Sequence, residues 1–381
     1  RKFTFASYFC GAGGLDIGFD SAGYKHIFSN DIDIASTKTI IKNRPEWDVK
    51  SCDIKEVSAI SIKSDVLCAG FPCQGFSLGG HREITDPRNE LYNEAIRVTK
   101  ESKPRVVVFE NVLNLRKMTF DNRVSAAETI ANALESIGYE VFYDSFRVSF
   151  FGAPQTRRRF IFIAFRDGAP KNYHLPLPDD VETTIESHLR DLAFDSILPK
   201  PKITNLSNNA YSWGFYSRVH LSKYKNPFEC NAQTIVPLRL SRTASDGNPV
   251  RSFDKPLQAL DTGTIWGWGA GNIEAERVSI DRTNSKNTRN RKSTQPLWRI
   301  NSDCIRRFSN RELARVQTFP DAWEFIAIKS NDIQKQIGNA VPVNFAIRIA
   351  ENVKKALIVM DEGGTFADDN IKNVYTQQKL L

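Results

Sequence analysis

The chain has 381 residues, of which 41% are hydrophobic and 25% are charged. These fractions are ordinary for a folded protein and exclude a disordered or collagen-like chain. A single hydrophobic core rarely grows beyond about 250–300 residues, so two domains are expected. The formal net charge is +8 and the pI is about 9.1. This modest excess of positive charge permits a nucleic-acid partner without requiring one.

Several other protein classes are excluded by what the sequence lacks. No run of 18 or more apolar residues is present, which argues against a transmembrane helix, and the N-terminal segment lacks the small-residue cleavage site of a signal peptide. Six cysteines, at positions 10, 52, 68, 73, 230 and 304, form no CxxC pair, and only five histidines accompany them. We therefore expect a cytoplasmic protein with reduced thiols, no disulfide framework and no metal site.

Short apolar strands alternate with segments of helical periodicity over about the first 165 residues. The predicted strands cover residues 4–9, 26–30, 66–71, 106–109, 141–148 and 160–165, and the predicted helices include 14–21, 90–102 and 124–137. Such alternation predicts an α/β fold with a doubly wound, mostly parallel sheet. Ligands of these sheets bind beyond the carboxyl ends of the strands, so the residues that follow each strand are the candidate site.

A glycine-rich loop, residues 9–14 (FCGAGG), follows the first predicted strand. Glycines there let the backbone approach a ligand at a helix N-terminus. The dinucleotide pattern GxGxxG fails because Asp16 stands at the third glycine position, so an adenosine-type ligand without a pyrophosphate, such as S-adenosylmethionine, fits better. Asp31 ends the next strand, where a carboxylate can accept both ribose hydroxyls. The alternatives are a tight turn for the loop and helix-capping roles for Asp31 and Asp53.

Two more strand ends carry reactive side chains. Cys73 leaves the sheet into a glycine-rich loop, and its thiol would need a nearby cation to act as a nucleophile. The arginines 157–159 could supply that cation. Glu110 closes the apolar run 106–109, where burial should raise its pKa and let it hold or donate a proton near neutrality. The alternative for Glu110 is a helix cap or an ion pair with one of the arginines.

Seven motifs in order make the chain resemble the cytosine-C5 DNA methyltransferase family of bacterial restriction–modification type. The motifs are FxGxGG, NDxD, CDI, PCQxFS, ENV, QTRRRF and GNAVP, and their order and spacing agree over residues 3–165 and 305–355. PCQ and ENV are the specific part of the match, whereas the glycine loop alone is not. The resemblance implies a Rossmann-like S-adenosylmethionine-dependent methyltransferase with a smaller, irregular, strand-rich target-recognition domain.

The resemblance also implies a mechanism, that of a DNA (cytosine-5-)-methyltransferase acting on a specific duplex sequence. Cys73 would add to C6 of a flipped-out cytosine, while Glu110 would hydrogen-bond the ring at N3. C5 would then take the methyl group of S-adenosylmethionine, leaving S-adenosylhomocysteine, without a metal. Arg159 would contact O2 of the base, and Arg157 would act beside it near the cysteine. Covalent activation divides one difficult step into easier ones, and the base must be extruded from the duplex.

The resemblance assigns a larger set of residues to the cofactor. Asp31 would bind the ribose hydroxyls, and Asp53 would bind the adenine amino group. The sequence departs from the family at Ile32, where an aromatic residue is common, which predicts modestly weaker cofactor binding. The full set consists of Phe9, Gly11, Gly13, Gly14, Asp31, Ile32, Asp53, Ile54, Phe71, Leu91, Asn339, Ala340 and Val341.

The alternating pattern is lost between the arginine motif and residue 311, where segments are short and rich in aromatic and turn residues. Residues 200–310 contain 18 Lys and Arg against 8 Asp and Glu, a net charge of +10, so the rest of the chain is close to neutral. In the family this insertion reads DNA. The DNA-binding candidates are Gln74 and Ser77 of the catalytic loop with Arg218, Arg239, Arg242 and Arg251 of the insertion.

Both ends of the chain are expected to build one domain. A short helix over 313–319, capped by Ser309 or Asn310, and a last helix within 334–360, after Gly338 and Pro342, return to the first domain. We expect a catalytic domain of residues 1–174 and 306–360, a target-recognition domain of residues 175–305, and a C-terminal tail of residues 361–381.

Two alternatives to a DNA methyltransferase remain open. A tRNA cytosine-5 methyltransferase of the same family typically carries a Cys-Phe-Thr element in the insertion, and this chain has none. A non-catalytic DNA-binding relative would not need Cys73, Gln74, Glu110 and Arg159 together. The expected partners are double-stranded DNA and a cognate restriction endonuclease that acts on the same sequence. The protein is expected to be a monomer in the bacterial cytoplasm, associated with the nucleoid when bound to DNA and with no membrane contact.

Overall fold

The centre of the computed structural model is one seven-stranded sheet. The structure describes residues 2–72, 91–116, 124–194, 236–239, 254–260, 266–269, 275–278, 297–300, 305–329 and 331–366. The strand order is β3-β2-β1-β4-β5-β7-β6, and β7 alone runs antiparallel to the others. The strands are β1 (Thr4–Tyr8), β2 (Lys25–Asp31), β3 (Val49–Ser51), β4 (Val66–Ala69), β5 (Val106–Val112), β6 (Glu140–Arg147) and β7 (Arg158–Phe165). This arrangement confirms the predicted doubly wound, mostly parallel sheet.

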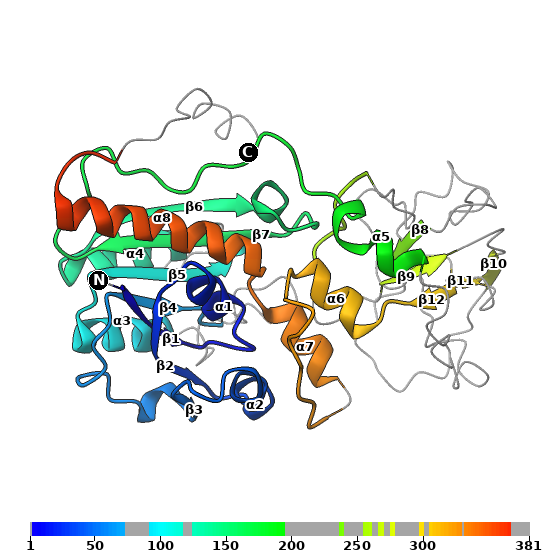
Figure 1. Cartoon of the computed structure of the whole chain (residues 1–381), viewed down its shortest axis with the longest axis horizontal. Helices are drawn as coiled ribbons and strands as arrows, with labels where there is room; N and C mark the ends of the chain where they lie inside the picture. Colours follow the sequence, from blue (N-terminus) through cyan, green and yellow to red (C-terminus); the bar gives the residue numbers. More distant parts are fainter. Residues whose placement is uncertain are drawn as a thin grey trace.

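The sheet is buried on both faces, which explains why its central strands are continuous apolar runs. All four residues of β4 and the run Val106–Phe109 of β5 are fully buried. On one face lie α1 (Gly14–Ser21) and α8 (Val343–Glu362), and on the other lie α3 (Leu91–Ser102) and α4 (Ala126–Ser136). Figure 1 shows α8 running along the sheet. A helix near the end of the chain therefore covers one face of the sheet to which the first strand, β1, belongs.

Helix boundaries follow local signals where the sequence provides them. Ser125 caps α4, and Ser309 caps α6 (Asn310–Val316), each in a reciprocal capping box with the glutamate three residues later. The predicted last helix begins at Val343, directly after Pro342, while a separate helix, α7 (Asp332–Asn339), precedes it. The structure also adds α2 (Ile34–Asn43) and β3, which the sequence pattern did not predict.

The described part of the insertion is built from short elements. They are α5 (Glu186–Phe194), β8 (Val236–Arg239), β9 (Trp266–Gly269), β10 (Ala275–Val278), β11 (Leu297–Ile300) and β12 (Ile305–Arg307). A three-stranded sheet has the order β12-β9-β8, and β10 pairs with β11. In Figure 1, α6 and α7 lie between the main sheet and this region. Among the described residues, no helix is long and apolar enough to span a bilayer.

A third apolar cluster joins the insertion to the two ends of the chain. Leu257, Leu260 and Trp266 of the insertion belong to the same buried cluster as Ile17 of α1 and Ile337 of α7. Burial of large apolar side chains across such a boundary contributes of the order of 1.5–3 kcal/mol per fully buried side chain. These residues of the insertion are therefore packed onto the main domain.

Two glycines of α1 allow the C-terminal segment to approach closely. A Cβ added to Gly14 would lie 2.3 Å from the carbonyl oxygen of Val341, and one added to Gly18 would lie 2.3 Å from Cβ of Ala346. Real Cβ atoms do not make contacts this short, so neither position tolerates a side chain without movement of the backbone. The absence of two side chains thus fixes the distance between α1 and α8.

We predict that Gly18→Ala lowers stability, although alanine favours a helix by about 1 kcal/mol over glycine. The added methyl group would collide with the backbone of α8, where overpacking costs typically 1–3 kcal/mol or more. Urea unfolding should show a net loss of about 1–2 kcal/mol. The double variant Gly18→Ala, Ala346→Gly removes one of the two colliding methyl groups and should recover part of the loss. Equal stability of Gly18→Ala and wild type would contradict the packing described here.

Candidate active site and cofactor site

A buried ion pair lies at the carboxyl edge of the sheet. Arg159 Nε is 2.6 Å from Glu110 Oε1, and both side chains are largely buried. Glu110 is on β5 and Arg159 is on β7, where Arg159 faces Val112 across the antiparallel ladder. Glu110 and Arg159 are therefore diagonal neighbours on one face of the sheet. The structure brings together two of the predicted catalytic residues, and the alternative reading of Glu110 as an arginine partner describes the same contact.

Burial controls the ionisation of this pair. Removal from water raises the pKa of Glu110, and the Arg159 guanidinium opposes this effect only in part. Burial likewise lowers the pKa of Arg159, against the effect of Glu110. Each group is thus shifted toward its neutral form. The direction of the Glu110 shift agrees with the effect of burial expected from the sequence.

The strand that leads to the predicted nucleophile is held by Asn111. Asn111 Nδ2 donates to the carbonyl oxygen of Phe71 at 3.0 Å, and Asn111 is buried. Phe71 packs edge-on against Phe109 and against Phe9. Cys73 itself lies outside the described residues, as do Gln74 and Ser77. The described residues therefore fix the chain up to Pro72, beside the carboxyl edge where Glu110 lies.

The glycine loop has an unusual backbone. Phe9, Gly11 and Gly13 all have positive φ angles, of 55°, 55° and 86°. For Phe9 this conformation is strained, and such strain persists only where the surroundings enforce it, commonly at binding sites. A Cβ added at Gly11 would meet no atom within 4 Å, so the loop faces open space there. The predicted loop is thus confirmed as a turn at the start of α1 that leaves room for a ligand.

Asp31 lies beside this open space. Its Oδ2 accepts from the backbone N–H of Gly11 at 2.7 Å, and its Oδ1 accepts from Asp33 N–H at 2.8 Å. Burial raises the pKa of Asp31, and the two backbone hydrogen bonds counteract it. The cap of α2 is Asp33, so the capping alternative for Asp31 is wrong. Next to it, the side chain of Ile32 is 69% exposed, a large apolar surface at the edge of the loop.

Asp53 and Ile54 occupy the following turn. Asp53 caps a 3₁₀ helix (Ile54–Glu56) through Lys55 N–H, so the capping alternative describes its present contact. Arg97 of α3 holds this turn, with Nη2 donating to the carbonyl oxygen of Ile54 at 2.8 Å and Nη1 donating to that of Val57 at 3.0 Å. Leu91 begins the same helix and packs against the second core cluster. Arg97 is itself held by ion pairs with Glu94 and Glu101 of α3. The sequence offered no signal for its contacts with the turn, since these are made to backbone carbonyl groups.

Arg157 has a different environment from Arg159. It is 2% exposed, and its terminal nitrogens donate to the carbonyl oxygens of Leu260 (2.8 Å), Gly338 (2.7 Å) and Asn339 (3.4 Å). These contacts join the arginine motif to the insertion and to the GNAVP segment. The predicted cofactor residues Asn339, Ala340 and Val341 therefore lie beside the same arginine. Among the DNA-binding candidates, Arg239 lies at the end of β8, and Arg218, Arg242 and Arg251 lie outside the described residues.

Asp16 is a buried acid that the motif pattern treated only as a missing glycine. It is fully buried, with Oδ2 accepting from Ser7 Oγ at 2.9 Å and Oδ1 accepting from Ser29 Oγ at 2.6 Å. Burial raises the pKa of Asp16 to about 6, although both hydroxyl groups oppose the shift. Ser29 also contacts His26 Nε2 at 2.8 Å. The sequence did contain a signal for this buried acid, namely a single acidic residue on the apolar face of a helix with serines in two neighbouring strands.

The sheet order, the glycine loop and the buried acid–arginine pair define a Rossmann-like methyltransferase. A family model described as C-5 cytosine-specific DNA methylase matches residues 3–355. The protein belongs to the C-5 cytosine-specific DNA methylase family and is a cytosine-C5 methyltransferase. This confirms the resemblance that the seven motifs indicated.

Curated relatives cover nearly the whole chain. It is 30% identical over 362 residues to the Type II methyltransferase M.FnuDI of Fusobacterium nucleatum, covering 92% of this chain and 94% of that protein. It is 31% identical over 358 residues to the Type II methyltransferase M.Eco47II of Escherichia coli, covering 92% and 78%.

Solved structures support the fold. The Entamoeba histolytica methyltransferase EhMeth has a TM-score of 0.57 at 15% identity, covering 94% of this chain and 99% of that chain. The Schizosaccharomyces pombe Dnmt2 methyltransferase has a TM-score of 0.56 at 16% identity, covering 96% and 100%. At this level of identity the likeness concerns the fold alone.

The buried Asp16 should make stability depend on pH. A folded-state pKa of about 6 lies above the unfolded value of about 3.8, so the fold binds a proton more tightly than the unfolded chain does. The contribution of Asp16 to the free energy of unfolding is therefore fully present below pH 4. It decreases as the pH rises toward 6 and stays low above pH 6. Asp16→Asn removes the titration. Between pH 4 and 7, its stability should rise by about 3 kcal/mol relative to wild type in urea unfolding; a flat difference would contradict the assignment.

Proposed function

We propose that this cytosine-C5 methyltransferase acts on duplex DNA through a covalent Cys73–C6 adduct and is the modification enzyme of a restriction–modification system. The observation that carries the proposal is the buried Glu110–Arg159 pair at the carboxyl edge of the sheet, beside the strand that leads to Cys73. The family resemblance assigns roles to Glu110 and Arg159, and their contact supports a joint role for the two side chains. The relatives' designation as Type II methyltransferases supports the biological setting.

The described residues fit S-adenosylmethionine as the cofactor. The open space at Gly11 admits a ligand close to the backbone, and Asp31 keeps free lone pairs for two ribose hydroxyls. The exposed Ile32 side chain supplies an apolar surface for an adenine face. Phe9, Gly13, Gly14, Asp53, Ile54, Phe71, Leu91 and residues 339–341 complete the proposed pocket. When bound, S-adenosylmethionine supplies the methyl group and leaves as S-adenosylhomocysteine.

The Glu110–Arg159 pair matches one edge of cytosine. N3 and O2 are adjacent acceptors on that edge, so each needs a donor. Arg159 donates to O2, and Glu110 donates to N3 if it carries a proton. Burial of Glu110 raises its pKa and favours that protonated form. The burial of the pair supports its role as two donors held in a site from which water is largely excluded.

The chemistry then proceeds from the chain's own groups. The Cys73 thiolate forms a bond to C6, the C5–C6 π electrons move to C5, and hydrogen bonds from Glu110 and Arg159 stabilise the charge that develops on the ring. After C5 has accepted the methyl group, a base removes the C5 proton. That electron pair re-forms the C5–C6 double bond and expels the Cys73 thiolate. The predicted role of Arg157 beside the cysteine stays a prediction, since its described contacts are with backbone carbonyls.

The insertion is proposed to hold and read the duplex. Its net charge of +10 over residues 200–310 suits phosphate contacts, and arginine side chains can read guanine. Gln74, Ser77, Arg218, Arg239, Arg242 and Arg251 remain the candidates. We propose that the enzyme works as a monomer on DNA in the bacterial cytoplasm, with a restriction endonuclease that recognises the same sequence. A tRNA substrate is less well supported, because the insertion lacks a Cys-Phe-Thr element.

Bisulfite sequencing of DNA from cells that express the protein tests this function directly. We expect full protection of cytosine at one position of a short recurring sequence, which also identifies the target. Cells that express Cys73→Ser should show none, because serine is a much weaker nucleophile, while the purified variant should still bind S-adenosylhomocysteine. Protection by the serine variant would reassign the nucleophile. The absence of modified DNA, with methyl transfer to RNA in vitro, would favour the tRNA alternative.

Glu110→Gln should separate cofactor binding from chemistry. Glutamine cannot carry the carboxylic acid proton to N3 and leaves Arg159 without its anionic partner. We expect kcat to fall by about 10²–10⁴-fold, with little change in S-adenosylhomocysteine affinity by calorimetry. Glu182→Gln is the control, because it breaks a different glutamate–arginine pair (Arg147, 2.7 Å) that includes no residue of the proposed site. Equal loss of activity in both variants would show that Glu110 has only a structural role.

A further inference from the structure

A buried chain of hydrogen bonds connects the insertion to the proposed cofactor pocket. It starts at Leu260, the last described residue of the segment that precedes β9. The Leu260 N–H donates to Gln155 Oε1 at 3.1 Å, and its carbonyl oxygen accepts from Arg157 Nη1 at 2.8 Å. Both backbone polar groups of one insertion residue are thus bound by two side chains of the QTRRR motif.

From these two side chains, two parallel routes reach residues 337–340. Gln155 Nε2 donates to Gln317 Oε1 at 2.7 Å, and Gln317 Nε2 donates to the carbonyl oxygens of Ile337 and Ala340 at 2.6 and 3.2 Å. Arg157 provides the second route through the carbonyl oxygens of Gly338 and Asn339. Each route is only one or two side chains long, and each ends within the segment that carries the cofactor candidates Asn339 and Ala340.

The members of this network are buried, so one of them cannot move without breaking hydrogen bonds to the others. Gln155 and Gln317 are fully buried, and Arg157 is 2% exposed. Within the described residues Arg157 makes no ion pair; its charge is stabilised by carbonyl groups at the C-terminal end of α7, where the helix dipole favours a cation. A displaced partner would leave a buried donor or acceptor unsatisfied, which strongly disfavours independent movement of one member.

Apolar packing reinforces the same connection. Leu257 and Leu260 belong to one buried cluster with Cys10 and Ala12 of the glycine loop and with Ala340. Leu257 also pairs with the motif itself, because Thr156 N–H donates to its carbonyl oxygen and its N–H donates to that of Pro154. A movement of residues 254–260 is therefore transmitted to both sides of the proposed cofactor pocket.

We propose that Gln155, Arg157 and Gln317 are positioning residues that couple DNA binding by the insertion to cofactor binding at residues 339–341. The inference rests on the proposed function, in which the insertion holds DNA and these residues contact the cofactor. DNA that fixes the insertion fixes Leu260, and through it the GNAVP segment. Coupling of this kind is reciprocal, so each ligand tightens the other by the same factor.

Calorimetry on the full-length protein measures this factor. The affinity for S-adenosylhomocysteine is determined alone and with a saturating duplex that carries the target found by bisulfite sequencing. The affinity for the duplex is then determined with and without S-adenosylhomocysteine. For wild type we expect the two ratios to agree, at a factor of about 10. A wild-type factor of 1 would overturn the proposal, whereas failure to bind S-adenosylhomocysteine at all would overturn the proposed function instead.

Two substitutions break the network at different points. Arg157→Lys keeps the charge but cannot reach Leu260 and Gly338 together, and Gln155→Met keeps the volume but removes the amide hydrogen bonds. In each variant we expect the factor to fall to within about twofold of 1, and in Gln155→Met the affinity for S-adenosylhomocysteine alone should change less than about threefold. Because the two variants are independent, a folding defect in one leaves the other to decide. A wild-type factor in either folded variant would exclude the corresponding route.

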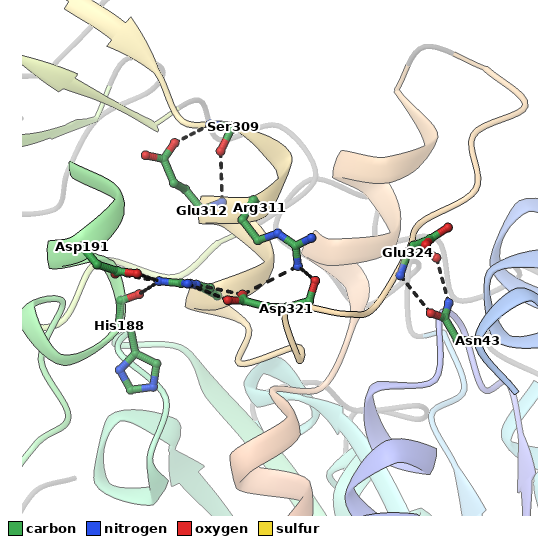
Figure 2. A network of polar contacts seen from close by, with 9 residues as sticks. Asn43, His188, Asp191, Ser309, Arg311, Glu312, Asp321 and Glu324 are labelled. Carbon is green, nitrogen blue, oxygen red and sulfur yellow. Dashed lines mark hydrogen bonds and ion pairs between the residues drawn. The ribbon is translucent and has the colours of Figure 1, made fainter. Parts of the chain in front are cut away.

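Arg315→Lys is the matched control. Arg315 also joins separate elements, with Nη1 2.6 Å from Asp191 on α5 and Nη2 2.6 Å from Asp321. Figure 2 shows the dashed contacts that link these two aspartates. The contacts of Arg315 involve neither Leu260 nor residues 337–341. In Arg315→Lys the coupling factor should therefore stay within about twofold of wild type. An equal loss in Arg315→Lys would mean that any weakened link between elements abolishes coupling, which would contradict a specific role for the network.

Discussion

The close approach of α1 to the end of the chain is the constraint on which the site depends. Gly14 lies against the carbonyl group of Val341, and Gly18 lies against Ala346. Because neither has a side chain, a segment more than 300 residues distant in sequence can close one side of the glycine loop. Gly14 of the motif therefore acts in packing, whereas the position at Gly11 is open.

The buried polar groups of the main domain divide according to how their charge is compensated. Glu110 and Arg159 compensate one another, and each is moved toward its neutral form by burial. Asp16 has only hydroxyl partners, so its acid form is favoured to higher pH. The guanidinium of Arg157 is bound by carbonyl oxygens. The main domain thus holds a buried acid–arginine pair, a buried acid with hydroxyl partners and a buried arginine with backbone partners.

Much of the fold and part of the site could be predicted from sequence, for reasons that differ by element. The central strands are apolar on both faces, so their pattern is unambiguous. Helix α2 was missed because it is rich in Ser and Thr, which are weak helix formers, and its stability comes from the Asp33 cap and from buried contacts such as Thr39 Oγ1 to Gln336 Oε1. Glu110 was identified by residue type and strand position, and Arg159 by its place in the QTRRR motif. Gln155, Gln317 and Asn111 were not given roles, because they act on backbone atoms or amides of distant segments, which leave no pattern in a single sequence.

The contact between the arginine motif and Leu260 has a consequence for how this enzyme can diversify. The hydrogen bonds that Gln155 and Arg157 make to Leu260 involve only its backbone. The hydrogen bond that Thr156 makes to Leu257 likewise involves only the backbone. Hydrogen bonds to the main chain place no requirement on which side chains the bound segment carries, beyond an apolar residue that fits the cluster. The insertion proposed to read DNA can therefore change its sequence, or be exchanged for another of different specificity, while its backbone contacts with the main domain stay the same.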